Sequence, residues 1–210
     1  MAQFFIVHAT HPQPRLIRQA AEILRHGGVI AYPTDSSYAL GAQIGNHGAV
    51  QKIRQIRGLD DEHHLTLVLR DLSALGHFAR LDNWQFRLVR QAVPGPYTFL
   101  LPATREVPRR LQDPKRSTVG LRVPDHPVVQ ALLAELGEPI LSSTLILPGE
   151  TRPLNDAEVI RERLEKRLDL ILDAGACAAQ PTTVVDLATQ PPTIVRHGRG
   201  NLERLGLAST

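Results

Sequence analysis

The stretch VIAYPTDSSYALGA, residues 29–42, joins a hydrophobic segment to five residues that can turn the chain or bind a ligand. Its first four residues have the apolar, partly β-branched character of a buried strand. Pro33 fixes its own φ and has no N–H to donate, so the polar side chains after it can point away from a sheet. Thr34, Asp35 and Ser36 therefore have two interpretations: a turn or helix cap formed by short polar side chains, or contacts to a ligand. Spacing alone does not choose between them.

The rest of the chain alternates strands with helices. Helical periodicity predicts helices within residues 11–28, 46–58, 71–92 (two helices), 126–137 and 156–168. Apolar, β-rich runs predict strands at residues 4–7, 29–32, 65–69, 97–103, 118–124, 138–144, 169–173, 182–188 and 193–198. Strands gather toward the two ends of the chain, which favours a mixed sheet over a parallel one. We therefore predict an α/β fold: a single domain over residues 1–210, with a twisted mixed β-sheet flanked by helices.

Composition and charge narrow the class of protein. The 210 residues are enough for one substantial core. There are 24 Lys and Arg against 21 Asp and Glu, a small excess that suits anionic ligands without requiring them. Cys177 is the only cysteine, which excludes an internal disulfide and a cysteine-based zinc site from this chain alone. No signal-peptide pattern or membrane-length apolar run is present, so we expect a cytoplasmic protein with no membrane partner.

Several predicted strands end in hydroxyl groups or arginine. In open α/β sheets ligands bind in the crevice beyond the strand ends, so we expect a site there. Arg57, Arg122 and Arg196 each lie within or at the end of an apolar element, where a guanidinium needs an anionic partner. That partner is either a ligand's phosphate or carboxylate, or an internal acid. The internal candidates are Asp35, Asp125 and Asp186.

A proline-rich basic loop spans residues 105–117. Its run of candidate phosphate-binding cations is Arg109, Arg110, Lys115 and Arg116. Such a run is either solvated charge or a contact to a phosphate backbone. The chain has only nine aromatic residues, which does not support a base-stacking platform, so recognition of folded RNA by shape would be the mode.

Several known catalytic motifs are absent. Neither standard glycine-rich nucleotide loop occurs, no Ser/His/Asp arrangement stands out, and no histidine pair lies beside a carboxylate at metalloprotease spacing. We therefore assign no metal site to the protein itself and interpret His126 as a turn or cap residue.

Six motifs in order resemble the YrdC family, over about residues 15–200. They are VIAYPTDSSYALG, PGPYTFLLP, TVGLRVPDHP, LSST, PTTVVDL and IVRHG. The start QFF and the segments VPRRL and LPGE look similar to the YciO branch of that family. The resemblance implies a twisted α/β sheet with a concave, positively charged cavity. It also implies a nucleotidyltransferase activity: family synthases join L-threonine, bicarbonate and ATP into threonylcarbamoyl-AMP for tRNA modification, with ATP as substrate and Mg²⁺ carried by the nucleotide.

The resemblance also implies roles for particular residues. The threonine-like substrate would be contacted by Thr34, Arg122 and Thr182. Nucleotide and phosphate would be bound by Arg57, Thr118, Ser142, Thr144 and Arg196. Tyr38 and Thr98 would shape the cavity wall.

Three motifs depart from the family pattern, and each loses one polar group to a hydrocarbon. The Lys-x-Arg motif reads Arg57-Gly58-Leu59, the Ser-x-Asn motif reads Thr144-Leu145-Ile146, and the histidine at the end of the next strand is Val68. Each missing polar group at a charge-stabilising position costs on the order of 2 to 4 kcal/mol of transition-state stabilisation. Arg54 and Arg70 are candidates to replace the missing cation.

Three hypotheses follow. The first is a YciO-type nucleotide-binding protein with altered or weakened acyl-adenylate synthase activity. The second is a protein that binds tRNA or double-stranded RNA through its basic cavity and the cations of residues 109–116, without synthase activity. The third is a different amide- or carbamoyl-transfer reaction, because Leu59 and Ile146 would make the pocket more apolar.

Overall fold

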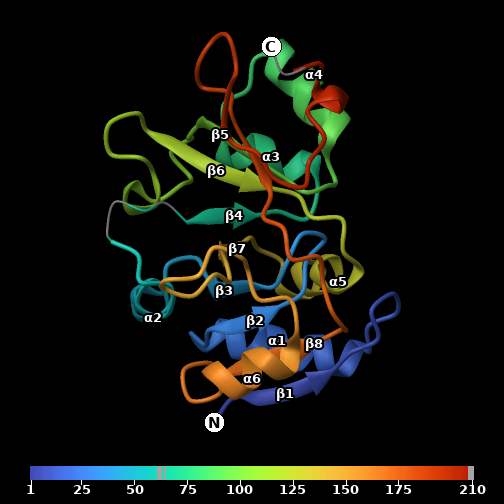
Figure 1. The fold of residues 1–210 in the computed structure, drawn as a ribbon. Helices are drawn as coiled ribbons and strands as arrows, with labels where there is room; N and C mark the ends of the chain where they lie inside the picture. The colour runs from blue at the N-terminus through green and yellow to red at the C-terminus, as the bar shows by residue number, and fades with distance from the viewer. Residues whose placement is uncertain (61–62, 64, 208–210) are drawn as a thin grey trace.

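The computed structural model describes residues 1–60, 63 and 65–207, whose strands form one ten-stranded mixed sheet (Figure 1). The strands are β1 (Gln3–Ile6), β2 (Ile30–Tyr32), β3 (Ala39–Gln43), β4 (Thr66–Val68), β5 (Tyr97–Pro102), β6 (Thr118–Arg122), β7 (Ile140–Thr144), β8 (Leu170–Asp173), β9 (Thr183–Asp186) and β10 (Thr193–Arg196). The helices are α1 (Pro14–Arg25), α2 (His47–Arg57), α3 (Leu72–Phe78), α4 (Asn83–Ala92), α5 (Pro127–Leu136) and α6 (Ala157–Leu164), with short 3₁₀ turns at Arg109–Leu111 and Glu203–Leu205. The predicted α/β class and mixed sheet are confirmed.

The strand order is β1-β8-β2-β3-β7-β4-β6-β5-β9-β10. The pairs β1–β8, β2–β8, β4–β6 and β5–β9 are parallel, and the other neighbours are antiparallel. Strands distant in sequence thus become neighbours, and the turns that follow β2 and β6 come within bonding distance of each other. No helix of the described residues is long and apolar enough to cross a membrane.

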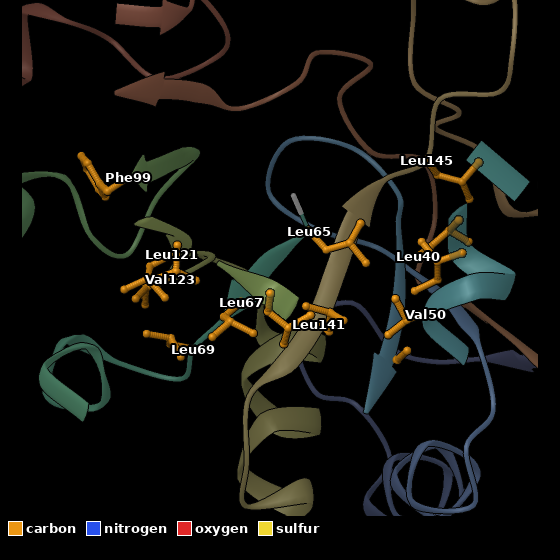
Figure 2. Close-up of a cluster of buried hydrophobic side chains, with 14 of the residues drawn as sticks. Leu40, Val50, Leu65, Leu67, Leu69, Phe99, Leu121, Val123, Leu141 and Leu145 are labelled. Carbon is orange, nitrogen blue, oxygen red and sulfur yellow. The ribbon is translucent and has the colours of Figure 1, made fainter. Parts of the chain in front are cut away.

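One face of the sheet is covered by four helices, α2, α3, α4 and α6. Leu67 of β4 is in register with Leu121 of β6 and Leu141 of β7, so these three side chains point to the same side. With Phe99 they form the larger hydrophobic core (Figure 2). Apolar residues at helical spacing, such as Val50 of α2, pack against this layer.

The opposite face is covered over only part of its width. The buried sides of α1 and α5 pack against Tyr32, Ile140 and Leu170 in the second hydrophobic core. Farther along the same face, Thr66 of β4 is in register with Gly120 and Ser142. Because these side chains are small or polar, the sheet forms the floor of a cavity there.

Strand β3 was not predicted. Its sequence, ALGAQ, contains no β-branched residue, and it becomes a strand because it pairs with β2 on one side and β7 on the other. Gly41 is required by close approach: a Cβ at this position would lie 2.8 Å from the ring of Tyr32 and 3.0 Å from Ile140.

Truncating the core of the central strands should destabilise the fold strongly. Leu141 is 0% exposed, so Leu141→Ala should lower the free energy of unfolding by about 2–5 kcal/mol, measured by urea denaturation. As the control, Ile6→Ala on edge strand β1, where Ile6 is 71% exposed, should change it by about 0.5 kcal/mol or less. Equal effects of the two substitutions would contradict this description of the core.

Candidate ligand-binding site

A cavity of about 510 Å³ lies on the partly uncovered sheet face. We call it the arginine cavity, and its walls are formed by Arg57, His63, Thr66, Val68, Thr98, Leu100, Arg122, Ser142, Ser143, Thr144, Thr182, Val184, Val195 and Arg196. The expectation of a site beyond the strand ends needs correction here, because most of these residues lie within β4, β5, β6, β7, β9 and β10. The side chains that alternate with core residues build the site.

Strand register brings Arg122 and Arg196 to the same face. Val68 is opposite Arg122, and Val184 of β9 pairs both with Thr98 of β5 and with Arg196 of β10. Arg57 enters from the last turn of α2. Burial and the charge of Arg196 lower the pKa of Arg57, and burial and the charge of Arg122 lower the pKa of Arg196. The three cations therefore lie within electrostatic reach of one another.

Arg122 is held by the turn that follows β2. Its side chain forms an ion pair with Asp35, and the same Nη2 atom donates to Thr34 Oγ1 at 3.1 Å and to Ser36 Oγ at 3.0 Å. The residue is 5% exposed, and its Nε is buried with no hydrogen-bond partner among the described residues. An internal acid thus neutralises Arg122, yet one strong donor remains unsatisfied. A buried donor without a partner is unfavourable, and an anion that reached it would relieve that cost.

The turn itself answers the question raised by residues 33–37. Thr34 Oγ1 donates to the carbonyl of Ser37 at 2.6 Å and accepts from the amides of Ser36 and Ser37, each at 3.2 Å. The turn interpretation is therefore correct, and the turn also presents Asp35 to Arg122. Thr34 contacts Arg122 but lies on the wall of an adjoining cavity instead of the arginine cavity.

Arg57 and Arg196 are bonded only to neutral oxygens within the described part of the chain. Arg196 donates from Nε to the carbonyl of Thr182 and from Nη2 to Thr182 Oγ1, both at 3.0 Å. Arg57 donates from Nε to Ser143 Oγ at 3.1 Å and from Nη1 to the carbonyl of Ile146. Two half-buried cations without carboxylates give the cavity a positive potential, which favours anions such as phosphate.

Other predicted site residues divide into two groups. Thr98 and Thr182 line the cavity with their hydroxyl oxygens 2.9 Å apart, and Ser142 and Thr144 line it from β7. Thr118 is buried at the far end of β6 and is not among the described lining residues.

Tyr38 does not shape the cavity wall, and that prediction is wrong. The residue is fully buried in the larger core, on the opposite face of the sheet, and its hydroxyl donates to the carbonyl of Gly175 at 3.0 Å. Burial raises the pKa of Tyr38.

The residues that depart from the family pattern do not all contribute to the cavity. Val68 lies on its floor, opposite Arg122, whereas Leu59 packs against the core. Ile146 contributes its main-chain oxygen to Arg57, and its side chain is not among the described lining residues. The expectation that Leu59 and Ile146 make the pocket more apolar is therefore wrong, and Val68 is the departure that changes it.

Neither proposed substitute cation lines the arginine cavity. Arg54 donates to the carbonyl of Asp60 at 2.8 Å and so supports the turn after α2. Arg70 is exposed and pairs with Asp71 at 3.1 Å. The prediction that one of them replaces the missing cation is not supported by their positions.

The cations of the basic loop also fall into two groups, according to whether they are paired with a described residue. Arg109, Arg110 and Lys115 are exposed, and their side chains have no ion pair or hydrogen bond with any described residue. Arg116 instead forms a 2.5 Å ion pair with Asp186, which is 3% exposed. Arg116 is thus already paired, and Asp186 is not the partner of a cavity arginine.

Sequence reasoning missed some residues of the cavity floor. Thr66, Leu100 and Val184 all line it, and Ser143 anchors Arg57. Alternation within each strand could have assigned the first three to one face, but not shown that this face opens onto a cavity. Within residues 1–60, 63 and 65–207, no group of three or more His, Cys, Asp or Glu side chains is placed to hold a metal ion.

Comparison with known proteins identifies the family. The Sua5/YciO/YrdC family model, described as telomere recombination, matches residues 22–198, and the chain belongs to this family. The uncharacterized protein YciO of Escherichia coli K12 is 52% identical over 203 residues, which are 97% of this chain and 98% of YciO. The crystal structure of E. coli YciO matches with a TM-score of 0.95 and 51% identity, covering 98% of this chain and all of that one. The resemblance to the family and to its YciO branch is confirmed.

More distant relatives have a named activity. The threonylcarbamoyl-AMP synthase of Bacillus subtilis is 32% identical over 184 residues, which are 87% of this chain and 53% of the synthase. This chain therefore matches about half the length of that enzyme. The crystal structure of P. abyssi Sua5 complexed with L-threonine matches with a TM-score of 0.85 and 27% identity, over 93% of this chain and 57% of Sua5.

Removing Asp35 should leave the buried Arg122 without its counter-charge. We expect Asp35→Ala to lower the free energy of unfolding by about 3–5 kcal/mol in urea denaturation, because breaking a buried pair leaves an uncompensated charge. Glu150→Ala, which removes the more exposed pair with Arg163, is the control and should cost about 1 kcal/mol or less. Similar destabilisation by both substitutions would contradict a structural role for Asp35.

Proposed function

We propose that this protein binds ATP in the arginine cavity and forms an acyl adenylate there, as a threonylcarbamoyl-AMP synthase-like nucleotidyltransferase with altered or weakened activity. The observation that carries the proposal is the convergence of three arginines, two of them paired only with neutral oxygens of the described residues, around one cavity. Two relatives support the proposal: one is named threonylcarbamoyl-AMP synthase, and the other is a Sua5 whose crystal structure contains L-threonine.

The substrates would occupy different parts of the cavity. The carboxylate of an amino-acid-like substrate would bind Arg122, whose Nε has no partner among the described residues, with Thr34 and Thr182 close by. The nucleotide would lie toward Arg57 and Arg196, beside Ser142 and Thr144. Mg²⁺ would arrive with ATP, held largely by phosphate oxygens and water, since hard cations prefer oxygen ligands. Thr118, the other residue predicted to bind the nucleotide, is not among the described lining residues and would contact the nucleotide from outside the cavity.

The reaction requires mainly that two anions be held together. In the proposed step an oxygen of the carboxylated amino acid attacks the α-phosphorus, a new P–O bond forms, and the bond to pyrophosphate breaks. The arginines would position both anions and stabilise the charge that develops on the departing pyrophosphate. Val68 cannot hydrogen-bond to a substrate, which is the reason to expect altered selectivity or rate. The product would serve tRNA modification, and we expect the reaction to occur in the cytoplasm.

The synthase proposal is tested by incubating the protein with ATP, L-threonine and bicarbonate and measuring pyrophosphate. Arg196→Ala should reduce the rate about 10²- to 10³-fold, the range for removal of one charge-stabilising donor, and Arg122→Ala should abolish it. Arg15→Ala, on the exposed surface of α1, is the matched arginine control and should leave the rate unchanged.

Two outcomes separate the parts of the proposal. If the wild-type protein releases no more pyrophosphate than Arg122→Ala, the synthase activity is refuted for these substrates. Calorimetric titration with ATP then decides whether nucleotide binding remains, and ATP affinity that is unchanged by Arg196→Ala refutes that as well. A different amide- or carbamoyl-transfer reaction becomes the explanation if ATP binds but threonine does not react.

A second candidate function is RNA binding. It is favoured by Arg109, Arg110 and Lys115, three exposed side chains on one loop without partners among the described residues. Such cations can contact the phosphates of tRNA or double-stranded RNA without reading sequence. Arg116 is a weaker candidate because it is paired with Asp186.

Binding through this loop should weaken steeply with salt. Replacing Arg109, Arg110 and Lys115 by Ala should reduce the affinity for double-stranded RNA. It should also make the slope of log K against the logarithm of the salt concentration less steep, by roughly 0.9 for each phosphate that is no longer neutralised. A triple variant of the exposed Arg15, Arg18 and Lys166 removes the same charge elsewhere and should retain the wild-type slope. Affinity that is insensitive to salt, or equally reduced by both triple variants, excludes the loop as the surface that binds RNA.

A further inference from the structure

A second cavity, of about 410 Å³, lies beyond the ends of β2, β6 and β8. We call it the strand-end cavity, and its charged or titratable residues are Asp35, Asp125, His126, Cys177, Arg199 and Arg204. It shares no described lining residue with the arginine cavity, although Asp35 on its wall is bonded to Arg122. Its volume is in the range of about 300–1,000 Å³ that is usual for small-molecule sites, and crevices beyond strand ends are common places for them.

Two arginines on this wall are uncommitted. The side chains of Arg199 and Arg204 form no ion pair or hydrogen bond with any residue that the structure describes. Their main chain is nevertheless anchored: the amide of Arg199 donates to the carbonyl of Pro181 at 2.9 Å, and Arg204 belongs to the 3₁₀ turn Glu203–Leu205, which packs against α4. Two cations are thus presented to the cavity from a fixed backbone.

The two acidic residues of the strand-end cavity differ in their bonding. Asp35 is neutralised by Arg122, and its second oxygen accepts from the amide of Asp125 at 3.1 Å. The side chain of Asp125 has no ion pair or hydrogen bond within the described part of the chain, so it is the uncommitted acid of this wall. The cavity therefore offers two available positive groups and one available negative group.

The remaining groups add no competing charge. Burial lowers the pKa of His126, so the ring is neutral near pH 7, and its Nδ1 is buried without a hydrogen-bond partner among the described residues. Burial raises the pKa of Cys177 to about 11, so its thiol is also uncharged. Apart from the polar Thr34, the other walls are small and apolar, formed by Ala174, Ala176 and Ala178 together with the segment from Pro94 to Pro96. They leave room for a short side chain and offer it little polar contact.

We propose that the strand-end cavity is a second ligand site, and that it binds a small zwitterion of the free α-amino-acid class. Arg199 and Arg204 hold the carboxylate, for which the guanidinium group is geometrically suited. Asp125 holds the ammonium group and disfavours a simple anion by charge repulsion. This inference does not rest on the proposed synthase function, because the three residues that would hold the zwitterion, Arg199, Arg204 and Asp125, have no role in that reaction.

Calorimetric or NMR titration of the full chain with L-alanine tests the inference, with acetate and inorganic phosphate as comparison ligands. L-Alanine should bind more tightly than either comparison ligand. Arg199→Ala combined with Arg204→Ala should weaken L-alanine binding at least about tenfold. Asp125→Asn should lower the affinity for L-alanine and raise the affinity for acetate. Arg15→Ala, an exposed arginine control on α1, should change the affinity less than about twofold. Arg199, Arg204 and Asp125 are exposed, so an unchanged melting temperature confirms that their variants are folded.

Each contrary outcome overturns the inference in a recognisable way. Tighter binding of phosphate or acetate than of L-alanine shows an anion site without zwitterion selectivity. L-Alanine binding that is unchanged in the Arg199/Arg204 variant places the amino acid outside the strand-end cavity, for example at Arg122, which leaves the proposed function standing. No binding of L-alanine up to about 10 mM, where even a weak site would respond, refutes a ligand site of this class.

Discussion

The contact between Arg122 and the turn at residues 34–37 is the constraint on which both cavities depend. β2 and β6 are separated in the sheet by β3, β7 and β4, yet the turn after β2 bonds to the last residue of β6. A guanidinium that is 5% exposed needs this partner, because burying an unpaired charge costs several kcal/mol. The ion pair with Asp35 fixes the turn and forms part of the wall of the strand-end cavity. It also holds Arg122 with its Nε unbonded to any residue that the structure describes.

The arginine cavity also concentrates positive charge where the fold does not compensate it. Arg57 and Arg196 are bonded to hydroxyl and carbonyl oxygens, which support a cation but do not neutralise it. Burial lowers the pKa of both, the charge of Arg196 adds to the shift of Arg57, and the charge of Arg122 adds to that of Arg196; such shifts are the energetic sign of a site that an anion would stabilise. The small and polar residues of this sheet face have the same consequence, because they leave a hollow where α1 and α5 do not pack.

The chain and the synthases belong to the same family, whereas a shared reaction is only proposed. The chain is much closer to YciO, whose activity is unassigned, than to the synthase it resembles. Of the positions where a hydrocarbon replaces a polar group of the synthase pattern, only Val68 is among the described residues of the arginine cavity, directly opposite Arg122. Any difference in chemistry should therefore begin at the substrate carboxylate end, where a hydrocarbon replaces a polar side chain.

The sequence by itself determined the alternation of strands and helices and the family, because period and local motif are properties of neighbouring residues. Among the site residues it predicted, Arg57, Arg122, Arg196, Thr98 and Thr182 lie around one cavity in the structure. Only the tertiary structure decided that β3 is a strand, that Tyr38 faces the core, and that Arg116 pairs with Asp186, 70 residues away. It also decided that the arginine cavity lies on the sheet face, since pairing register and the limited reach of α1 and α5 are set by contacts between distant segments.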